Sequence, residues 1–233
     1  MQALRVVPKI FYFDTFKEFN EEFNIGKGDI MVTNQWMYDP YVKPLGVDIP
    51  VIYQEKYGKG EPSDEMIDAM VADMKAYDYD RIIAFGGGTI VDICKILALE
   101  STEKSVDLFT GKKMPKKVKE LIVVPSTCGT GSEVTNVAIA ELKSLQTKKG
   151  LAVEETYADI AVLIPESLQG LPDYVFATSS IDALIHMTCR GADGRAGLKA
   201  AGKNRMADCP RSVPVPDGCA RSRRPGRAAD RAR

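Results

Sequence analysis

Three consecutive glycines at positions 86–88, followed by Thr89, constrain this chain more than any other part of its sequence. An apolar run at 82–85 precedes them and predicts a short buried strand, and residues 90–99 predict a helix. Glycines allow a tight turn and let backbone N–H groups approach a ligand closely. A helix N-terminus adds unpaired donors and partial positive charge, which favour a phosphate. We interpret this turn as a phosphate site rather than a plain strand-to-helix turn, for which one or two glycines would suffice.

A second glycine-containing run, residues 125–133, follows another apolar strand predicted at 121–124. Its sequence, Pro-Ser-Thr-Cys-Gly-Thr-Gly-Ser-Glu, offers hydroxyl donors and flexible amides at a second strand end. Ligands of open α/β sheets bind outside the carboxyl ends of the strands. Two such runs in one chain predict a dinucleotide cradle, although neither matches the Gly-x-Gly-x-x-Gly fingerprint or the P-loop pattern.

Strand and helix patterns alternate along residues 1–165, which predicts a doubly wound α/β domain with a parallel sheet. Helices are expected after Thr15, which fits a capping box, and after Ser63. Strands are expected at 10–13, 29–34, 51–53, 82–85, 121–124 and 160–164, and a further strand pair at 137–140 and 150–153.

Two stretches of this region predict interruptions. Pro40 is expected to stop a short turn or helix near 36–38, because proline lacks the backbone N–H that a helix uses. Residues 101–120 are polar and rich in lysine, which predicts a solvated surface loop. A helical stretch is expected to begin near Leu171 and to continue through 181–188.

The composition changes at residue 191. Residues 191–233 hold nine Arg and two Lys against four Asp, a net charge of +7, and they lack aromatic residues, Ile and Glu. Such a segment buries too little apolar surface to order itself, so we expect a disordered tail. A basic tail can indicate nucleic-acid binding, but without an aromatic residue for base stacking we predict no nucleic-acid partner. We interpret the change as a loss of the true C-terminal part, for instance by a shift of reading frame.

Composition also bears on the location of the protein. The sequence holds no apolar run of about 18 residues, which a membrane span requires. Its first residues lack the apolar core of a signal peptide. We therefore expect a cytoplasmic protein without a membrane partner, whose five cysteines stay reduced.

The two glycine-rich runs also carry a resemblance. Residues 86–95, Gly-Gly-Gly-Thr-x-x-Asp-x-x-Lys, and residues 125–135 resemble the signature of the iron-containing alcohol dehydrogenase family. Residues 182–186, Asp-Ala-Leu-Ile-His, are similar to the start of its metal site. Its bacterial 4-hydroxybutyrate dehydrogenase subgroup is similar to this chain at residues 54–58, 60–67, 128–141 and 147–150. The resemblance covers about residues 1–188.

The resemblance implies an NAD-dependent oxidoreductase that interconverts 4-hydroxybutyrate and succinate semialdehyde by metal-assisted hydride transfer, with Fe²⁺ or Zn²⁺. A small-molecule 4-hydroxy acid or aldehyde would be the substrate, and an intact member would be a homo-oligomer. It also implies three segments: a dinucleotide-binding domain at 1–165, the start of an all-helical metal-binding domain at 166–190, and an off-pattern tail at 191–233. Dehydrogenases of other primary alcohols or diols, and an inactive nucleotide-binding remnant, stay open as alternatives.

The cofactor residues follow from the two runs. Gly87, Gly88 and Thr89 are the candidates for the pyrophosphate, and Thr127 and Thr130 are candidate hydroxyl donors.

Three further positions are placed at the site by the resemblance. Asp92 would act near the reacting atoms, whereas the sequence alone would equally permit a local ion pair with Lys95. Lys149 would contact the nucleotide, with Lys148 as the alternative. Asn34 stands where many family members carry an Asp that holds the ribose hydroxyls, and its neutral amide leaves the choice between NAD and NADP open.

Asp182 and His186 are the candidate metal ligands, since a spacing of four residues puts both on one helical face. From spacing alone, an Asp and a His without metal would be the more common situation, because metal sites use three or four ligands. The resemblance implies that the two are half of a four-ligand site that two later histidines complete. The chain has one histidine in total, so we expect at most half of that site.

Overall fold

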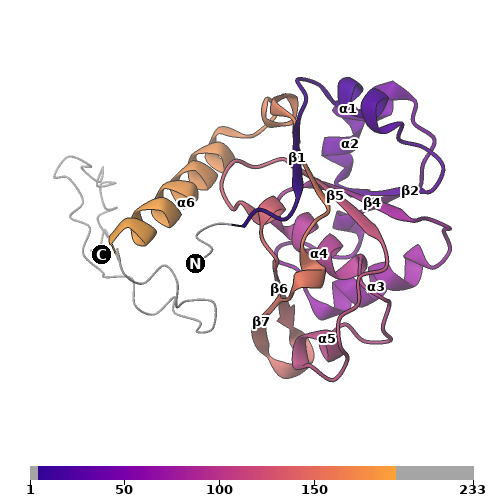
Figure 1. Ribbon diagram of the computed structural model, residues 1–233, viewed down its shortest axis with the longest axis vertical. Coiled ribbons are helices and arrows are strands. Elements are labelled where there is room, and N and C mark those ends of the chain that lie inside the picture. Colours follow the sequence, from indigo (N-terminus) through magenta and orange to yellow (C-terminus); the bar gives the residue numbers. More distant parts are fainter. Residues whose placement is uncertain (1–4, 193–233) are drawn as a thin grey trace, which may run out of the picture. The chain divides into compact units, whose positions relative to one another are not determined.

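The computed structural model describes residues 5–192, with side chains through residue 185 (Figure 1). The chain divides into two units at residue 186, and the described fold lies almost entirely in the first. The expected tail lies, from residue 193 on, outside the described residues, and the division expected at 165 and 190 stays a prediction. The elements are β1 (Lys9–Tyr12), α1 (Phe16–Phe23), β2 (Asp29–Thr33), α2 (Gln35–Tyr41), β3 (Val51–Tyr53), α3 (Asp64–Met74), β4 (Arg81–Gly86), α4 (Gly88–Leu97), α5 (Val106–Thr110), β5 (Glu120–Pro125), β6 (Val137–Leu142), β7 (Thr147–Ala152), β8 (Ile160–Leu163) and α6 (Asp173–Ala192).

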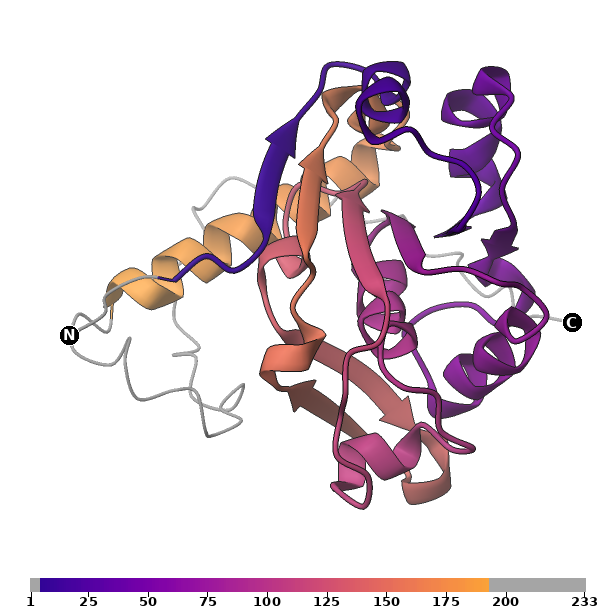
Figure 2. The same ribbon diagram turned by 45° about the vertical axis from the view of Figure 1, so that its right-hand side comes forward.

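Six strands form one parallel sheet in the order β1-β8-β5-β4-β2-β3. Figure 2 shows β1 in indigo, β8 in orange and β5 in rose side by side along this sheet. The strands β6 and β7 form a separate antiparallel pair, which confirms the expected pairing of 137–140 with 150–153. Most of the polar loop expected between them is strand as well, because β6 runs to Leu142 and β7 begins at Thr147. The predicted fold class, a doubly wound α/β domain with a parallel sheet, is confirmed.

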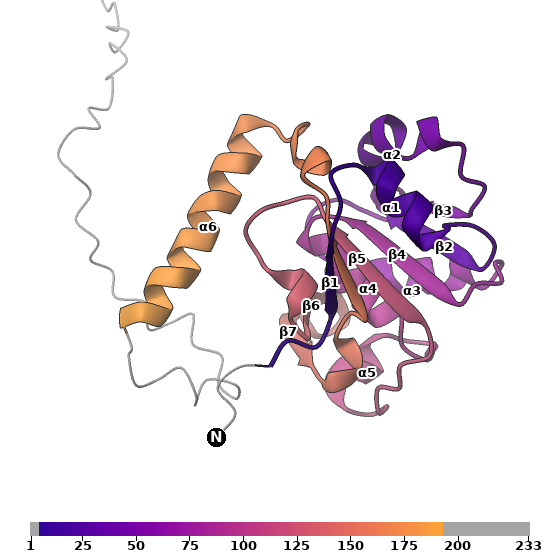
Figure 3. The same cartoon turned by 45° about the horizontal axis from the view of Figure 1, so that its top comes forward.

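The central strands alternate between two cores, as the period of two in a strand requires. Ile82 and Ala84 of β4 belong to the core that also contains the apolar faces of α3 and α4. Ile83 and Phe85 belong to the opposite core, which contains residues of α1 and α2. Figures 1 and 3 show these two pairs of helices on opposite faces of the sheet. The strands read as continuous apolar runs because both of their faces are covered.

Two predicted helix starts are confirmed by their caps. The hydroxyl of Thr15 accepts from Glu18 N at 3.2 Å, and the carboxylate of Glu18 accepts from Asp14 N at 3.0 Å. Ser63 caps α3 by accepting from Met66 N at 3.2 Å. Each cap satisfies backbone donors that a helix start would otherwise leave unpaired.

Two expectations about interruptions were wrong. Helix α2 continues through Pro40 to Tyr41, and Val42 N still donates to Tyr38 O, so the proline removes one hydrogen bond without ending the helix. Residues 101–120 are not simply a surface loop, because they contain α5, whose Leu108 and Phe109 are each 4% exposed. Two adjacent large apolar side chains are anchored in the core, and the lysines around them obscured this in the sequence.

The helical stretch predicted from about residue 171 is observed as α6, which runs to Ala192. In the described part of the chain, no helix combines the length and apolar character that a membrane crossing needs.

Candidate functional site

The strand order creates one position where a ligand crevice is expected. From β2 the chain passes through α2 to its neighbour β3, whereas from β4 it passes through α4 to β5 on the other side. Connections that leave adjacent strands in opposite directions open a crevice outside their carboxyl ends, where open α/β sheets bind ligands. Two strand ends border this crevice: Asn34 follows β2, and the glycine turn 86–88 begins at the last residue of β4.

At this crevice the two glycine-containing runs lie against each other. A Cβ built on Gly87 would lie 3.5 Å from Thr127 Cγ2, and one built on Gly88 would lie 3.6 Å from Thr130 Cγ2. The backbone joins them too, since Ser126 N donates to Gly86 O at 3.0 Å. The structure therefore brings four of the predicted cofactor residues together.

The glycines are needed for space rather than for unusual backbone angles. Gly87 has φ −77° and ψ −176°, which any residue adopts, and Gly86 and Gly88 also have negative φ. A Cβ on Gly86 would lie 2.4 Å from Ile90 Cδ1 and 3.1 Å from Ile90 Cβ, so Ile90 would have to shift. At 87 and 88 a Cβ would make ordinary contacts with Thr127 and Thr130, so a larger side chain would have to enter the space between the two runs.

Helix α4 begins at Gly88, and its N-cap residue Gly87 supplies no side-chain cap. The first N–H groups of this ten-residue helix are therefore donors for a ligand, and the helix dipole favours an anion there. The hydroxyl of Thr89 donates to Gly60 O at 3.3 Å, which ties the helix start to the loop before α3.

Thr130 has the geometry of a hydroxyl donor. Its Oγ1 accepts from Ser132 N at 3.3 Å, so the oxygen is held while its hydrogen can be given to an acceptor in the crevice. Thr127 lies opposite Gly87, within the same gap.

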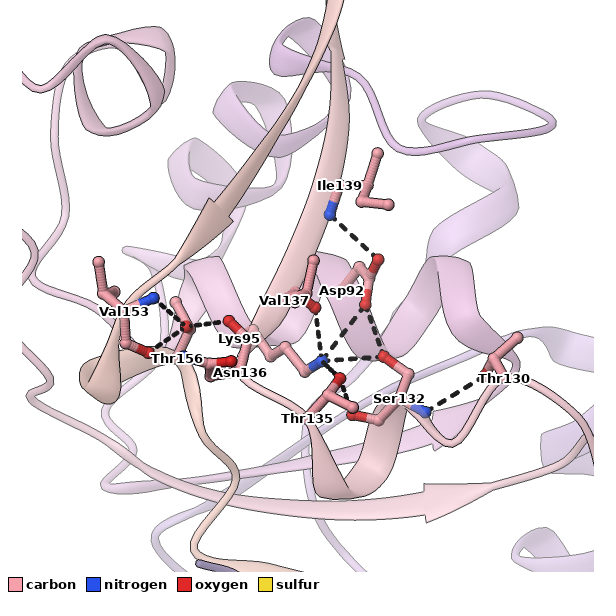
Figure 4. A network of polar contacts seen from close by, with 10 residues as sticks. All are labelled: Asp92, Lys95, Thr130, Ser132, Thr135, Asn136, Val137, Ile139, Val153 and Thr156. Carbon is pink, nitrogen blue, oxygen red and sulfur yellow. Dashed lines mark hydrogen bonds and ion pairs between the residues drawn. The ribbon is translucent and has the colours of Figure 1, made fainter. Parts of the chain in front are cut away.

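Asp92 and Lys95 belong to a network that fixes the second run, as Figure 4 shows. Lys95 is 0% exposed, and its Nζ donates to Ser132 Oγ at 2.9 Å and to Val137 O at 2.7 Å. It also lies 3.5 Å from Asp92 Oδ1, which makes the i,i+3 pair that the spacing allowed. Burial lowers the pKa of Lys95, and the nearby carboxylate of Asp92 opposes that shift.

The carboxylate of Asp92 is occupied by contacts within the protein. Its Oδ1 accepts from the hydroxyl of Ser132 at 2.7 Å, and its Oδ2 accepts from Ile139 N at 3.1 Å (Figure 4). Asp92 thus connects α4 to the second run and to β6. Its catalytic role stays a prediction, and the contacts seen here are those of a residue that positions the two runs.

At the end of β2, the structure adds a residue that sequence reasoning did not select. Asn34 Nδ2 donates to Glu55 Oε2 at 2.7 Å, and Glu55 follows β3. The two positions are 21 residues apart, and only the pairing of β2 with β3 brings them together.

Lys149 and Lys148 lie on β7, where both are exposed. Lys148 forms an ion pair with Glu61. Glu61 lies in the loop before α3, next to Gly60, whose carbonyl accepts the hydrogen bond of Thr89. No ion pair of Lys149 occurs among the described residues, so its charge is the more available for a phosphate.

The candidate metal ligands lie on α6. Asp182 is described with its side chain, whereas the side chain of His186 lies outside the described residues. In the part of the chain with described side chains, no group of three or more His, Cys, Asp or Glu residues could hold a metal ion. The described donor set therefore does not fit a structural or catalytic metal, which takes three or four protein ligands.

Comparison with known proteins gives consistent matches. Residues 9–165 match the family model described as iron-containing alcohol dehydrogenase. The chain is 53% identical over 188 residues to 4-hydroxybutyrate dehydrogenase of Clostridium kluyveri, which covers 81% of this chain and 51% of that protein. It is 34% identical over 160 residues to sulfoacetaldehyde reductase of Bilophila wadsworthia, over 64% of this chain and 41% of that protein. The chain thus spans about half the length of the curated relatives it matches.

A solved structure supports the fold. Sulfoacetaldehyde reductase from Bifidobacterium kashiwanohense, in complex with NAD+, matches with a TM-score of 0.67 at 22% identity. The match covers 78% of this chain and 51% of that chain. At this identity the likeness concerns the fold alone.

Proposed function

The chain belongs to the iron-containing alcohol dehydrogenase family, and on that premise we propose that it binds NAD in the crevice outside the carboxyl ends of β2 and β4. The observation that carries this proposal is the contact of the two glycine-containing runs, with Gly87 against Thr127 and Gly88 against Thr130. An anion with two phosphates suits this place, because a helix start without a side-chain cap faces it.

Residues of both glycine-containing runs would bind the phosphates of NAD. The N–H groups at Gly88 and Thr89 donate to one phosphate, and the missing side chains of Gly87 and Gly88 leave room for it. The hydroxyls of Thr127 and Thr130 donate from the opposite side. The network of Asp92 and Lys95 keeps that second side in place.

For the whole protein we propose an NAD-linked oxidation of 4-hydroxybutyrate to succinate semialdehyde. When bound, NAD supplies the hydride acceptor, so the substrate gives the hydride of its C4 carbon to the nicotinamide and its hydroxyl proton to solvent. The support is the 53% identity to the Clostridium kluyveri enzyme. Other primary alcohols or diols are the same-family alternatives, and the match to a sulfoacetaldehyde reductase shows that relatives with other substrates exist.

A nucleotide-binding chain without turnover is the second candidate. The small number of candidate metal ligands favours it, because Asp182 and His186 would supply two ligands and the chain has no further histidine. We therefore derive no step through a metal ion for this chain.

One experiment separates these functions. NAD binding to the purified chain is measured by calorimetry, and NAD reduction is then assayed with 4-hydroxybutyrate, 1,3-propanediol or ethanol, each with and without added Fe²⁺ or Zn²⁺. Binding with turnover of 4-hydroxybutyrate supports the dehydrogenase, and binding without turnover supports the second candidate. A chain that binds no NAD overturns the proposal.

A further inference from the structure

The residue at the end of β2 lacks the charge that selects between dinucleotides. In nucleotide-binding α/β folds, a carboxylate near the ribose accepts hydrogen bonds from its hydroxyls and repels the 2′-phosphate of NADP. Here Asn34 is the first residue after β2, at the crevice proposed to bind NAD. A neutral amide gives no repulsion, so residue 34 by itself leaves the two cofactors undistinguished.

Glu55 brings a carboxylate to the same place from the neighbouring strand. Its Oε2 accepts from Asn34 Nδ2 at 2.7 Å, and its Oε1 accepts from Gln35 N at 2.6 Å. Glu55 is an exposed side chain, and it is held against the start of α2 by these two bonds. The negative charge therefore lies at the carboxyl end of β2, although its residue follows β3.

The orientation of the amides is fixed by acceptors on both sides. Gln54 Nε2 donates to Gly58 O at 3.0 Å, and a carbonyl oxygen can only accept, so Gln54 Oε1 faces Asn34. Asn34 Nδ2 donates to that Oε1 at 3.3 Å and to the carboxylate of Glu55. Both amide hydrogens of Asn34 are thus used by acceptors of the protein.

We infer that Glu55, rather than residue 34, selects NAD over NADP in this chain. The inference rests on the proposed NAD site and names its specificity-determining residue. Each carboxylate oxygen of Glu55 uses one of its acceptor positions for the protein, so a second remains for a ribose hydroxyl. A 2′-phosphate in that place would instead put its negative charge against the carboxylate.

The charge of Lys56 does not neutralise the carboxylate of Glu55. Lys56 is the next residue, but its Nζ lies 5.2 Å from the ring centre of Tyr53, and no ion pair between Lys56 and Glu55 occurs among the described residues. The carboxylate of Glu55 accepts from neutral donors in the part of the chain that the structure describes, so no ion pair there neutralises its charge.

The test uses the full chain and measures binding rather than turnover. Dissociation constants for NAD+ and NADP+ are determined by calorimetry for the unmodified chain, for Glu55→Gln and for Glu65→Gln. Glu55→Gln keeps an oxygen that can accept from Gln35 N, so the start of α2 is preserved. Glu65→Gln removes the same charge at an exposed site on α3, where the carboxylate pairs with Lys143.

We expect the unmodified chain to bind NAD+ at least about tenfold more tightly than NADP+, because the carboxylate of Glu55 repels the 2′-phosphate of NADP+. Glu55→Gln should improve NADP+ binding relative to NAD+ by about tenfold, the order expected when one charge near a surface phosphate is removed. Glu65→Gln should leave the ratio unchanged. Equal affinities in the unmodified chain, or the same ratio in Glu55→Gln as in the unmodified chain, overturn the inference while the NAD site stands; a chain that binds neither dinucleotide overturns the proposed function itself.

A second variant separates the two positions. Asn34→Asp would place a carboxylate against Glu55 and against Gln54 Oε1, so it should weaken binding of both dinucleotides without sharpening the preference for NAD+. A stronger preference for NAD+ in Asn34→Asp, with Glu55→Gln unchanged, would assign the selection to residue 34 instead. Melting temperatures of all variants identify any loss of fold.

Discussion

The hydroxyl of Ser132 donates to Asp92 Oδ1 at 2.7 Å, and this one contact joins the helix after the first glycine-rich turn to the second run. The same carboxylate accepts a hydrogen bond from Ile139 N, and the buried ammonium of Lys95 lies beside it. The two sides of the proposed phosphate site are therefore positioned by a single acidic residue beneath them.

Asp92→Asn should destabilise the chain by about 2–4 kcal/mol, because the ammonium of Lys95 would stay buried without its carboxylate. Urea unfolding followed by circular dichroism measures the loss. Asp107→Asn is the matched control, since its partner Lys112 is exposed and the pair lies 3.6 Å apart. That control should cost less than about 1 kcal/mol. Equal effects of the two substitutions would show that Asp92 supports no buried charge.

The loss in Asp92→Asn should shrink as the pH rises toward about 10. Burial already lowers the pKa of Lys95, and removal of Asp92 takes away the charge that opposed this shift. Between the pKa of Lys95 in the folded state and the higher pKa in the unfolded state, the unfolded chain binds more protons, so stability increases with pH. Unfolding free energies of both proteins at about pH 7, 8.5 and 10 check this trend, and a constant difference would contradict it.

Gly88→Val should abolish NAD binding with little loss of stability. Its Cβ would lie 3.6 Å from Thr130 Cγ2, and the two methyl groups of valine would fill the space between the runs. Calorimetry with NAD+ is the measurement. Gly26→Val serves as the control, because Gly26 precedes β2, away from the carboxyl ends of the strands, and a Cβ there meets only Asn24 O at 3.8 Å. Unchanged affinity in Gly88→Val would exclude this turn as the phosphate site.

Lys149→Gln should weaken NAD binding by about three- to tenfold, since the loss of one charge–phosphate contact is of that order. Lys148→Gln should have a smaller effect, because Lys148 is already paired with Glu61. Titrations at low and high salt give a second readout, in which the difference between the unmodified chain and Lys149→Gln narrows as salt screens the charge. If Lys148→Gln is the weaker binder, the assignment of the two lysines is reversed.

The purified chain should contain far less than one iron or zinc ion per molecule, and chelation should leave its affinity for NAD unchanged. Asp182 and His186 are two candidate ligands, and divalent ions in proteins normally take three or four. Elemental analysis, and calorimetry with NAD+ before and after treatment with EDTA, test both statements. Stoichiometric metal that survives dialysis would show that other groups complete the site.

The sequence was most informative where local chemistry decides the structure. The apolar runs at 82–85 and 121–124 became the central strands, and Thr15 and Ser63 became helix caps. It was less informative where packing competes with local preference. Pro40 lies inside α2, where it removes one hydrogen bond but the helix still buries Met37 in the core.

The sequence also identified the candidate residues of the site, but not which of them contact each other. Gly87, Gly88, Thr127 and Thr130 were identified as two separate candidate runs, and their mutual contact depends on the pairing of β4 with β5. The i,i+3 spacing of Asp92 and Lys95 indicated a weak local pair, whereas the fold buries the lysine beneath the second run. Burial raises the energetic consequence of the same contact, because water no longer screens it.

By itself, the sequence determined most of the strand and helix pattern, the two glycine-containing runs and the family, because these depend on residues that are close along the chain. The tertiary structure alone decided that Asp92 links the two turns and that Glu55 stands beside Asn34. Those partners are 40 and 21 residues apart, and no spacing rule reaches that far. Their contact follows from the order of strands in the sheet, which is set by how both apolar faces are buried at once.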